Sequence, residues 1–185
     1  MDDRLSVLFV CTGNMYRSPM AEAFFRVAVT ERGLDFTTSS AGTLEGDRPI
    51  APMALSLVRR VDPGMAAHRS RPLRADDVAG ADLVLGMTRE HVREVVVLVP
   101  EAWDRTFTLK ELARRGSLAG PRRLDQTLTD WLVMVGAGRS RSDLLGDSDI
   151  DDISDPVGDP ASLGRSVARE IKAMVGTLVE LVLPG

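Results

Sequence analysis

Residues 6–20 read SVLFVCTGNMYRSPM and contain the pattern on which the fold prediction depends. Residues 6–10 form an apolar run without the alternation of a half-exposed strand, which is typical of a buried parallel strand. From Ser18 onward, apolar residues recur at helical spacing, and Ser18 followed by Pro19 predicts a helix cap there. Gly33 predicts the end of this helix. The stretch therefore predicts a strand, a polar turn and a helix in succession.

The same alternation continues along the rest of the chain. Strands are predicted at residues 36–41, 81–85 and 105–109, and helices at residues 51–61, 74–79, 88–97, 110–115, 127–135 and 163–183. Residues 138–160 are polar and acidic, and are typical of a long surface loop. Strands that alternate with helices favour a parallel sheet covered by helices on both faces. Ligands of such sheets bind at the carboxyl ends of the strands, where the helices begin.

Length and composition fit one globular domain over residues 1–185. Apolar residues make up 44% of the chain, and 23 basic against 27 acidic residues give a net charge of −4. Nucleic-acid-binding domains carry a basic excess, so we expect no nucleic-acid partner. No apolar run approaches the ~20 residues of a membrane span, so we expect no membrane partner.

Cys11 is the only cysteine, and it lies in the first turn between a strand and a helix. An internal disulfide is therefore excluded, and one cysteine with two histidines disfavours a structural zinc site. The first residues, MDDR, are largely acidic and do not resemble a secretory signal. These features predict a cytoplasmic protein.

The turn that holds Cys11 has the arrangement C-x5-R-S, from Cys11 through Arg17 to Ser18. A loop that curls into a helix N-terminus points several backbone N–H groups inward and binds anions. Gly13 permits a backbone turn that other residues resist, and Arg17 supplies a planar fork that holds two phosphate oxygens. The same positive field would stabilise the thiolate of Cys11. We therefore predict a phosphate-binding loop made of Thr12, Gly13, Asn14, Met15, Tyr16, Arg17 and Ser18.

On residue type alone, the favoured interpretation is that Cys11 is a small buried side chain and Arg17 a surface charge at a helix start. The spacing, the strand–loop–helix context and the Ser-Pro pair together favour the anion site. A nucleotide-binding P-loop is disfavoured because the turn lacks the Gly-Lys-Ser/Thr ending.

A cysteine phosphatase also needs an acid to protonate the leaving group. Asp155 is a candidate because Pro156 restricts its backbone to an extended form, which could aim the carboxyl across a pocket. Four further acids, Asp147, Asp149, Asp151 and Asp152, precede it in the same loop, and Asp159 follows it. The residues alone leave the choice among these carboxylates open.

Four segments together resemble the low-molecular-weight protein tyrosine phosphatase family. They are residues 10–22, the SSAGT stretch at 39–43, the HRSR stretch at 68–71 and the pair Asp155-Pro156. The resemblance covers nearly the whole chain. It implies a three-layer αβα fold with a four-stranded parallel sheet.

The resemblance also implies a role for individual residues. Cys11 would be the nucleophile, Arg17 the group that holds the transition state, and Asp155 the acid and then the base. Asn14, Ser18, Ser40 and His68 match positions that brace the phosphate loop. The implied reaction passes through a cysteinyl-phosphate, requires no metal or cofactor, and releases inorganic phosphate. The partner would be a phosphorylated protein or a small phosphomonoester.

Two departures from the family pattern bear on redox chemistry and substrate. Tyr16 stands where many relatives have a second cysteine, so an internal disulfide cannot protect Cys11. Relatives commonly have aromatic residues around the pocket, whereas residues 44–49 and 157–158 have none. Tyr16, Trp103 or Phe107 could supply an aromatic wall or belong to the core. Arg139 and Arg141 form a basic spot that could receive an acidic substrate or belong to a solvated loop.

Protein phosphotyrosine is the expected substrate, and Met15 favours this aryl phosphate because phosphotyrosine enzymes of this fold commonly have a bulky aliphatic residue there. Phosphoarginine and small phosphorylated metabolites are alternatives, because the aromatic rim is missing. Arsenate reduction with an external thiol is a third reading, and a non-catalytic phosphate-binding module is a fourth.

Overall fold

The centre of the molecule is a parallel sheet of four strands in the order β2-β1-β3-β4. The computed structural model describes residues 5–34, 36–158 and 161–183. The strands are β1 (Leu5–Cys11), β2 (Phe36–Gly42), β3 (Leu83–Gly86) and β4 (Thr106–Thr108). This sheet confirms the expected fold class, and it places the end of β1 between two neighbouring strands.

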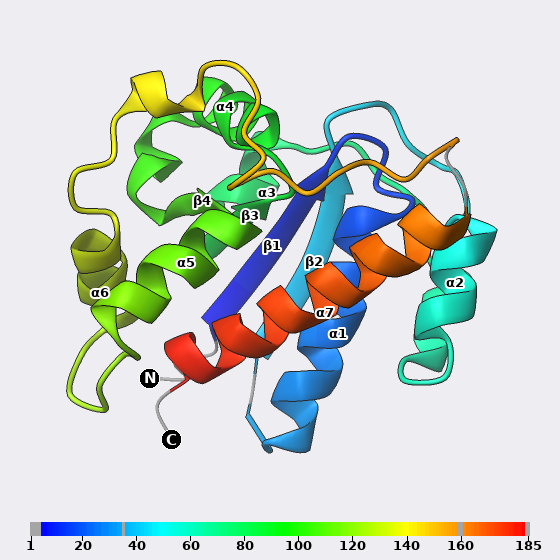
Figure 1. Cartoon of the computed structure of the whole chain (residues 1–185), viewed down its shortest axis with the longest axis horizontal. Helices are drawn as coiled ribbons and strands as arrows, with labels where there is room; N and C mark the ends of the chain where they lie inside the picture. Colours follow the sequence, from blue (N-terminus) through cyan, green and yellow to red (C-terminus); the bar gives the residue numbers. More distant parts are fainter. Residues whose placement is uncertain (1–4, 35, 159–160, 184–185) are drawn as a thin grey trace.

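Helices cover both faces of the sheet, as Figure 1 shows. They are α1 (Arg17–Glu31), α2 (Pro52–Val58), α3 (Ala75–Ala79), α4 (Arg89–Leu98), α5 (Leu109–Ala119), α6 (Leu128–Val135) and α7 (Ala161–Val182). Short 3-10 turns lie at Pro63–Ala67, Pro100–Arg105 and Arg141–Leu144. α1, α5 and α7 pack on one face, and α3 and α4 pack on the other. The result is the three-layer arrangement that the sequence predicts.

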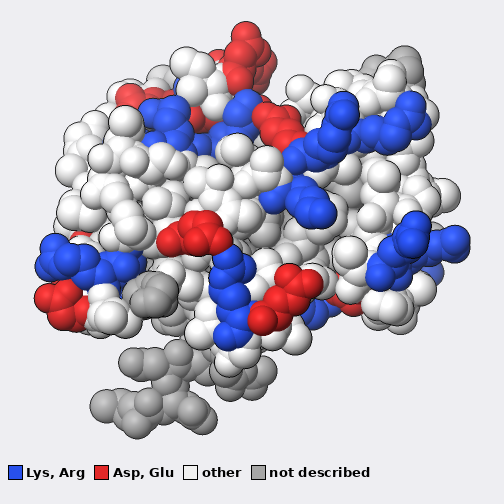
Figure 2. All heavy atoms as spheres, turned by 60° about the horizontal axis from the view of Figure 1, so that its bottom comes forward, with Lys and Arg blue, Asp and Glu red and all other residues white. Residues whose placement is uncertain are grey.

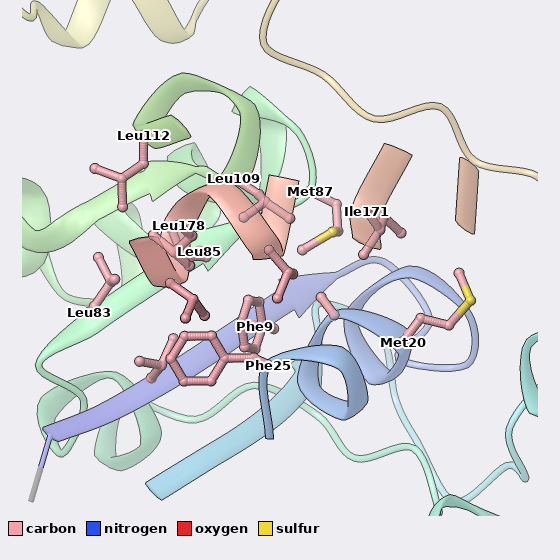
Figure 3. Close-up of a cluster of buried hydrophobic side chains, with 14 of the residues drawn as sticks. Phe9, Met20, Phe25, Leu83, Leu85, Met87, Leu109, Leu112, Ile171 and Leu178 are labelled. Carbon is pink, nitrogen blue, oxygen red and sulfur yellow. The ribbon is translucent and has the colours of Figure 1, made fainter. Parts of the chain in front are cut away.

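The side chains of β1 alternate between the two layers of helices. Phe9 belongs to the larger core cluster with Phe25 of α1 and Leu178 of α7, which Figure 3 shows. Leu8 and Val10 belong to the second cluster, with side chains of α3 and α4. Because both faces of β1 are buried, the strand reads as an unbroken apolar run.

The first helix begins two residues earlier than predicted, with its cap at Tyr16 and not at Ser18. α1 starts at Arg17 with Tyr16 at the capping position, so Ser18 lies inside the first turn and does not cap the helix. Ser18 is free of that role because its hydroxyl instead contacts the sulfur of Cys11 at 3.0 Å. Gly33, with φ of 66°, follows the last turn as predicted.

Three further segments differ from the sequence reading. α2 ends at Val58, before Asp62 caps the next turn by accepting a hydrogen bond from the Gly64 N–H. β4 is buried at every position and does not alternate, and its threonine hydroxyls bond to backbone groups. The acidic segment is not one long surface loop, since it contains a 3-10 turn and buries Leu144 and Ile153. Residues 159–160, at its end, lie outside the described residues.

No helix in the described ranges is long and apolar enough to cross a membrane. The face shown in Figure 2 carries Lys and Arg side chains interspersed with Asp and Glu.

Candidate functional site

The turn between β1 and α1 folds around the sulfur of Cys11. This side chain is buried, and its Sγ accepts a hydrogen bond from the Asn14 N–H at 3.2 Å. Asn14 has a φ of 48°, a left-handed conformation that asparagine tolerates better than most residues. The end of β2 lies close against this turn, because a Cβ on Gly42 would lie 2.7 Å from the Thr12 carbonyl oxygen.

The side chain of Asn14 holds the turn against β2 and the next segment. Its Nδ2 donates to the hydroxyls of Ser18 at 2.9 Å and Ser40 at 2.8 Å. Its Oδ1 accepts from the Arg71 N–H at 3.1 Å, and its backbone oxygen lies 2.8 Å from His68 Nε2. The four residues expected to brace the loop are therefore joined through Asn14.

Glu22 extends this network, and the sequence analysis did not single it out. Its carboxylate accepts a hydrogen bond from the Ser40 hydroxyl at 2.6 Å and pairs with Arg26. Glu22 is buried on α1, four residues after Ser18. At helical spacing Glu22 lies opposite the apolar positions 20, 23, 24, 27 and 28, so no local pattern indicated its burial.

Arg17 is buried at the start of α1 and contacts three residues, one in its own turn and two in the acidic segment. Its Nη1 donates to the Ile153 carbonyl at 3.1 Å, and its Nη2 donates to Thr12 Oγ1 at 3.2 Å. The same Nη2 pairs with Asp155 Oδ2 at 2.5 Å. Arg17 and Asp155 therefore meet, although 138 residues separate them in sequence.

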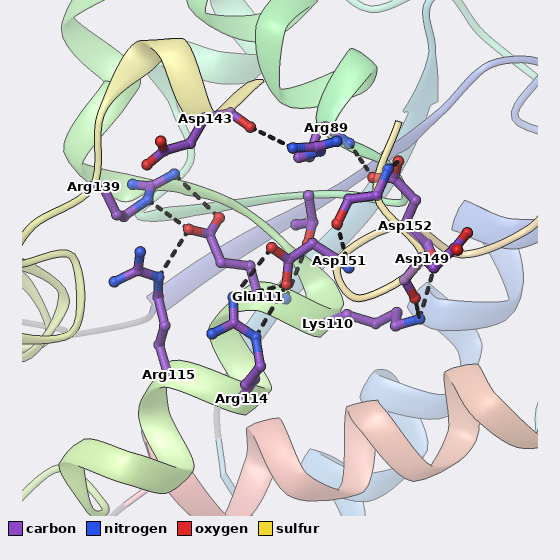
Figure 4. Close-up of polar contacts among 12 residues, drawn as sticks. Arg89, Lys110, Glu111, Arg114, Arg115, Arg139, Asp143, Asp149, Asp151 and Asp152 are labelled. Carbon is purple, nitrogen blue, oxygen red and sulfur yellow. Dashed lines mark hydrogen bonds and ion pairs between the residues drawn. The ribbon is translucent and has the colours of Figure 1, made fainter. Parts of the chain in front are cut away.

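Two other acids of the predicted loop, Asp151 and Asp152, hold the loop in place, as Figure 4 shows. Asp151 makes a bidentate pair with Arg114, and Asp152 accepts from the backbone N–H groups of Arg89 and Ser148. Lys110 donates to the backbone oxygens of Asp149 and Asp152. These contacts fix the segment before Asp155, whose side chain is 44% exposed beside Arg17.

A cavity of about 450 Å³ opens beside the turn. Thr12, Arg17 and Asp155 line it on the side of the turn. The rest of its lining is rich in acids, and none of the described lining residues is Phe, Tyr or Trp. These further lining residues are Thr88, Glu90, His91, Lys110, Asp147, Ser148, Asp149, Asp152, Ile153, Ser154 and Glu170. The cavity therefore contains the buried guanidinium of Arg17 and is otherwise lined mainly by negatively charged and polar side chains.

His91 is a second residue that the sequence analysis did not single out. It is buried in the first turn of α4, and its Nε2 lies 2.9 Å from Thr12 Oγ1. Burial and the nearby charge of Arg17 lower the pKa of His91 to about 3. The signal in sequence was the Thr88-x-x-His91 spacing of a capping box, which places the histidine at the helix start.

None of the three aromatic residues proposed for the pocket wall lines the cavity. Tyr16 is buried in the core, where burial raises the pKa of its phenol, and it packs against Gly164 of α7. Phe107 is fully buried, and Trp103 stacks on the guanidinium of Arg139. The rings of Tyr16 and Phe107 are more stable in the core than at the rim of a charged cavity, and Trp103 is partly buried against Arg139.

In the basic spot at residues 139–141, Arg141 is exposed, as expected of a solvated loop, whereas Arg139 has a structural role. Arg139 is buried, and its Nε donates to Glu111 Oε1 at 2.9 Å. Its guanidinium also lies 3.8 Å from the centre of the Phe107 ring. Burial lowers the pKa of Arg139, and the neighbouring Glu111 opposes that shift. Arg139 is therefore neither solvated nor placed to receive a substrate.

Comparison with known proteins connects this arrangement to one family. The sequence model described as "Low molecular weight phosphotyrosine protein phosphatase" matches residues 6–126. The chain is 30% identical over 174 residues to a protein-arginine-phosphatase of Geobacillus stearothermophilus, covering 94% of this chain and 93% of that one. It is 30% identical to the probable low molecular weight protein-tyrosine-phosphatase EpsP of Ralstonia solanacearum, covering 72% and 90%.

The fold gives the same result. The crystal structure of a low molecular weight protein tyrosine phosphatase from T. tengcongensis superposes with a TM-score of 0.70 and 31% identity. The superposition covers 95% of this chain and 98% of that chain.

Proposed function

Because the chain belongs to the low molecular weight phosphotyrosine protein phosphatase family, we propose that its Cys11 loop hydrolyses phosphate monoesters through a cysteinyl-phosphate. The observation that carries the proposal is the meeting of three groups around one turn. They are the buried sulfur of Cys11, the guanidinium of Arg17 and the carboxylate of Asp155.

In the first step, the Cys11 thiolate attacks phosphorus and forms the S–P bond while the bond to the leaving oxygen breaks. The Asn14 N–H and the Ser18 hydroxyl, both in contact with Sγ, stabilise the negative charge on sulfur. Asp155, in its acid form, transfers its proton to the leaving oxygen. A thiolate nucleophile has to stay reduced, which fits the cytoplasmic compartment expected from the single cysteine.

In the second step, Asp155 accepts a proton from a water molecule as the water oxygen attacks phosphorus. The S–P bond breaks, inorganic phosphate leaves, and Cys11 returns as a thiolate. Throughout both steps the three remaining phosphoryl oxygens are held by the N–H groups of the turn and by Arg17.

Arg17 links phosphoryl binding to the freedom of Asp155. The two side chains are paired at 2.5 Å, and a phosphoryl group above the turn competes for the same Nη2. A dianion is the stronger partner for a guanidinium than a single carboxylate. Its binding therefore releases Asp155 to reach the leaving group.

The test is hydrolysis of a generic aryl phosphate in excess EDTA. Wild type should turn over, and Cys11→Ser should lose activity by about a thousandfold or more, because a neutral hydroxyl replaces a thiolate. Asp155→Asn should lose about a hundredfold or more. Asp125→Asn removes an exposed carboxylate between α5 and α6 and should keep wild-type activity. Activity that persists in Cys11→Ser would refute the mechanism.

Protein phosphotyrosine is the substrate class that we propose first. It is the substrate in the description of the matching family, and Met15 of the turn is a flexible apolar side chain that can contact an aryl ring.

Phosphoarginine is the second candidate, and the cavity gives a specific reason for it. Glu90, Asp147, Asp149 and Glu170 surround the entrance to Arg17, and the cavity contains no aromatic residue in its described lining. Carboxylates favour a basic side chain, whereas ring stacking would favour tyrosine. The Geobacillus stearothermophilus relative is described as a protein-arginine-phosphatase.

Two peptides of one sequence decide between the candidates, one with phosphotyrosine and one with phosphoarginine at the same position. A kcat/KM at least about tenfold higher for the phosphotyrosine peptide supports the first candidate. The reverse ratio supports phosphoarginine. In that case Asp147→Asn should lower the phosphoarginine rate more than the phosphotyrosine rate.

A further inference from the structure

The hydrogen bonds of His91 determine which ring nitrogen carries its proton. Nδ1 lies 3.0 Å from the Thr88 backbone N–H, which can only donate, so Nδ1 is the acceptor. The Thr88 hydroxyl also lies 2.8 Å from Nδ1 and can donate to it. Because its pKa is about 3, the ring is neutral near pH 7 and has one proton. That proton is therefore on Nε2.

The protonated Nε2 determines in turn what the Thr12 hydroxyl can do. Nε2 lies 2.9 Å from Thr12 Oγ1 and donates to it. Arg17 Nη2 also donates to this oxygen, at 3.2 Å. Both lone pairs of the hydroxyl are then used. Within the described ranges, no group accepts the Thr12 hydroxyl proton, and Thr12 lines the cavity beside Arg17.

We propose that the Thr12 hydroxyl donates a hydrogen bond to an oxygen of the bound phosphoryl group, and that His91 is the positioning residue that makes it a donor. The phosphoryl group in this statement rests on the proposed function. The opposite tautomer of His91 would accept the Thr12 proton and leave no donor for the phosphoryl group. The Arg17 contact places this donor beside the guanidinium that binds the same group.

Matched variants distinguish the effect of the Thr12 hydroxyl from the effect of His91, which orients it. Thr12→Val removes the hydroxyl and keeps the shape, whereas Thr12→Ser keeps the hydroxyl. His91→Leu removes both polar atoms of the ring. His91→Gln keeps an acceptor for Thr88 and a donor for Thr12 on one planar group. Thr38→Val is the control, because Thr38 Oγ1 is buried in β2 and has no hydrogen-bond partner in the described part of the chain.

The measurement is the affinity for inorganic phosphate by titration calorimetry, which needs no turnover. Thr12→Val and His91→Leu should each weaken binding by about tenfold to a hundredfold, the usual effect of one hydrogen bond to a charged group. The double variant should bind no more weakly than Thr12→Val alone, because His91 acts through the hydroxyl. Thr12→Ser, His91→Gln and Thr38→Val should stay within about threefold of wild type, since the hydrogen bond is kept.

Two results would overturn the proposal. One is unchanged phosphate affinity in folded Thr12→Val, and the other is a further loss when His91→Leu is added to Thr12→Val. Nitrogen-15 NMR of the wild-type imidazole gives a test that needs no variant, since a proton on Nδ1 would contradict the assignment. A wild type that binds phosphate with this dependence but hydrolyses neither a phosphate ester nor phosphoarginine would refute the proposed function and leave this inference standing.

Discussion

Replacing Asn14 by alanine should destabilise the fold strongly, although it changes one small side chain in a turn. Asn14 is fully buried. The substitution removes the donor for Ser18 and Ser40 and the acceptor for the Arg71 N–H. It also places alanine at a φ of 48°, which asparagine tolerates better.

These contacts set the expected magnitude. The three side-chain hydrogen bonds contribute about 3 kcal/mol together, at about 1 kcal/mol each. The left-handed backbone adds about 1 kcal/mol for alanine. The loss of about 4 kcal/mol is a large part of the ~5–15 kcal/mol that stabilises a typical domain. It corresponds to a Tm lower by about 8–16 °C for a chain of this size.

Asn14→Gly is the matched control, measured by urea unfolding beside Asn14→Ala. Glycine removes the same hydrogen bonds but adopts positive φ without strain. It gains backbone entropy in the unfolded chain, and this offsets part of its advantage. We therefore expect the glycine variant to be as stable as the alanine variant or up to about 1 kcal/mol more stable.

Two outcomes would refute this reasoning. If Asn14→Ala lowers the free energy of unfolding by less than about 1 kcal/mol, the three side-chain hydrogen bonds do not stabilise the turn as expected. If Asn14→Gly is clearly less stable than Asn14→Ala, the left-handed conformation does not cost alanine about 1 kcal/mol.

Three further predictions concern α7, the buried arginine and pH. Gly164→Ala should lower the free energy of unfolding by about 1–3 kcal/mol, because its Cβ would lie 2.5 Å from the Met53 sulfur. A Cβ on Gly176 in the same helix would meet no atom within 4 Å, so Gly176→Ala should raise the free energy of unfolding by about 0.5–1 kcal/mol. Urea unfolding of the two variants tests whether their effects have opposite signs. Arg139→Met should lower the free energy of unfolding by about 3 kcal/mol, because the buried carboxylate of Glu111 loses its partner. An unchanged urea midpoint would contradict the importance of this ion pair. Because the pKa of His91 is about 3 in the folded protein, the unfolded chain binds more protons than the folded chain between pH 6.5 and about 3. The contribution of neutral His91 to the free energy of unfolding is therefore complete above pH 6.5 and decreases as the pH is lowered. Between pH 7 and 5, His91→Gln should therefore lose about 2 kcal/mol less stability than wild type, and equal losses would contradict the assignment.

Much of the architecture is predictable because its signals are local. The apolar run of β1 and the helical spacing after Ser18 identify the first strand and helix within about 25 residues. The boundary error at Ser18 is also local in origin. A Ser-Pro pair is a good helix cap, but here the hydroxyl bonds to Cys11, and the helix starts two residues earlier.

The misses concern side chains whose surroundings come from distant segments. Tyr16 reads as a pocket wall by its place in the turn, but α7 and α2 pack over it and make it part of the core. Arg139 reads as a surface charge in a polar loop, but Glu111 and Phe107 enclose it. Neither environment is visible within a sequence window, because each depends on helices far along the chain.

By itself, then, the sequence determined the parallel sheet, the turn that holds Cys11 and Arg17, and the resemblance to one family. These features follow from residues close together in the chain, where spacing sets geometry directly. The resemblance indicated Asp155, but only the tertiary structure shows by contact which carboxylate faces Arg17 and which histidine contacts Thr12. Six acids lie within residues 147–159, and the placement of Asp155 depends on Lys110, Arg114 and the backbone of Arg89, which hold the loop from other elements. Such contacts join residues distant in sequence, so they exist only once the sheet and its helices have formed.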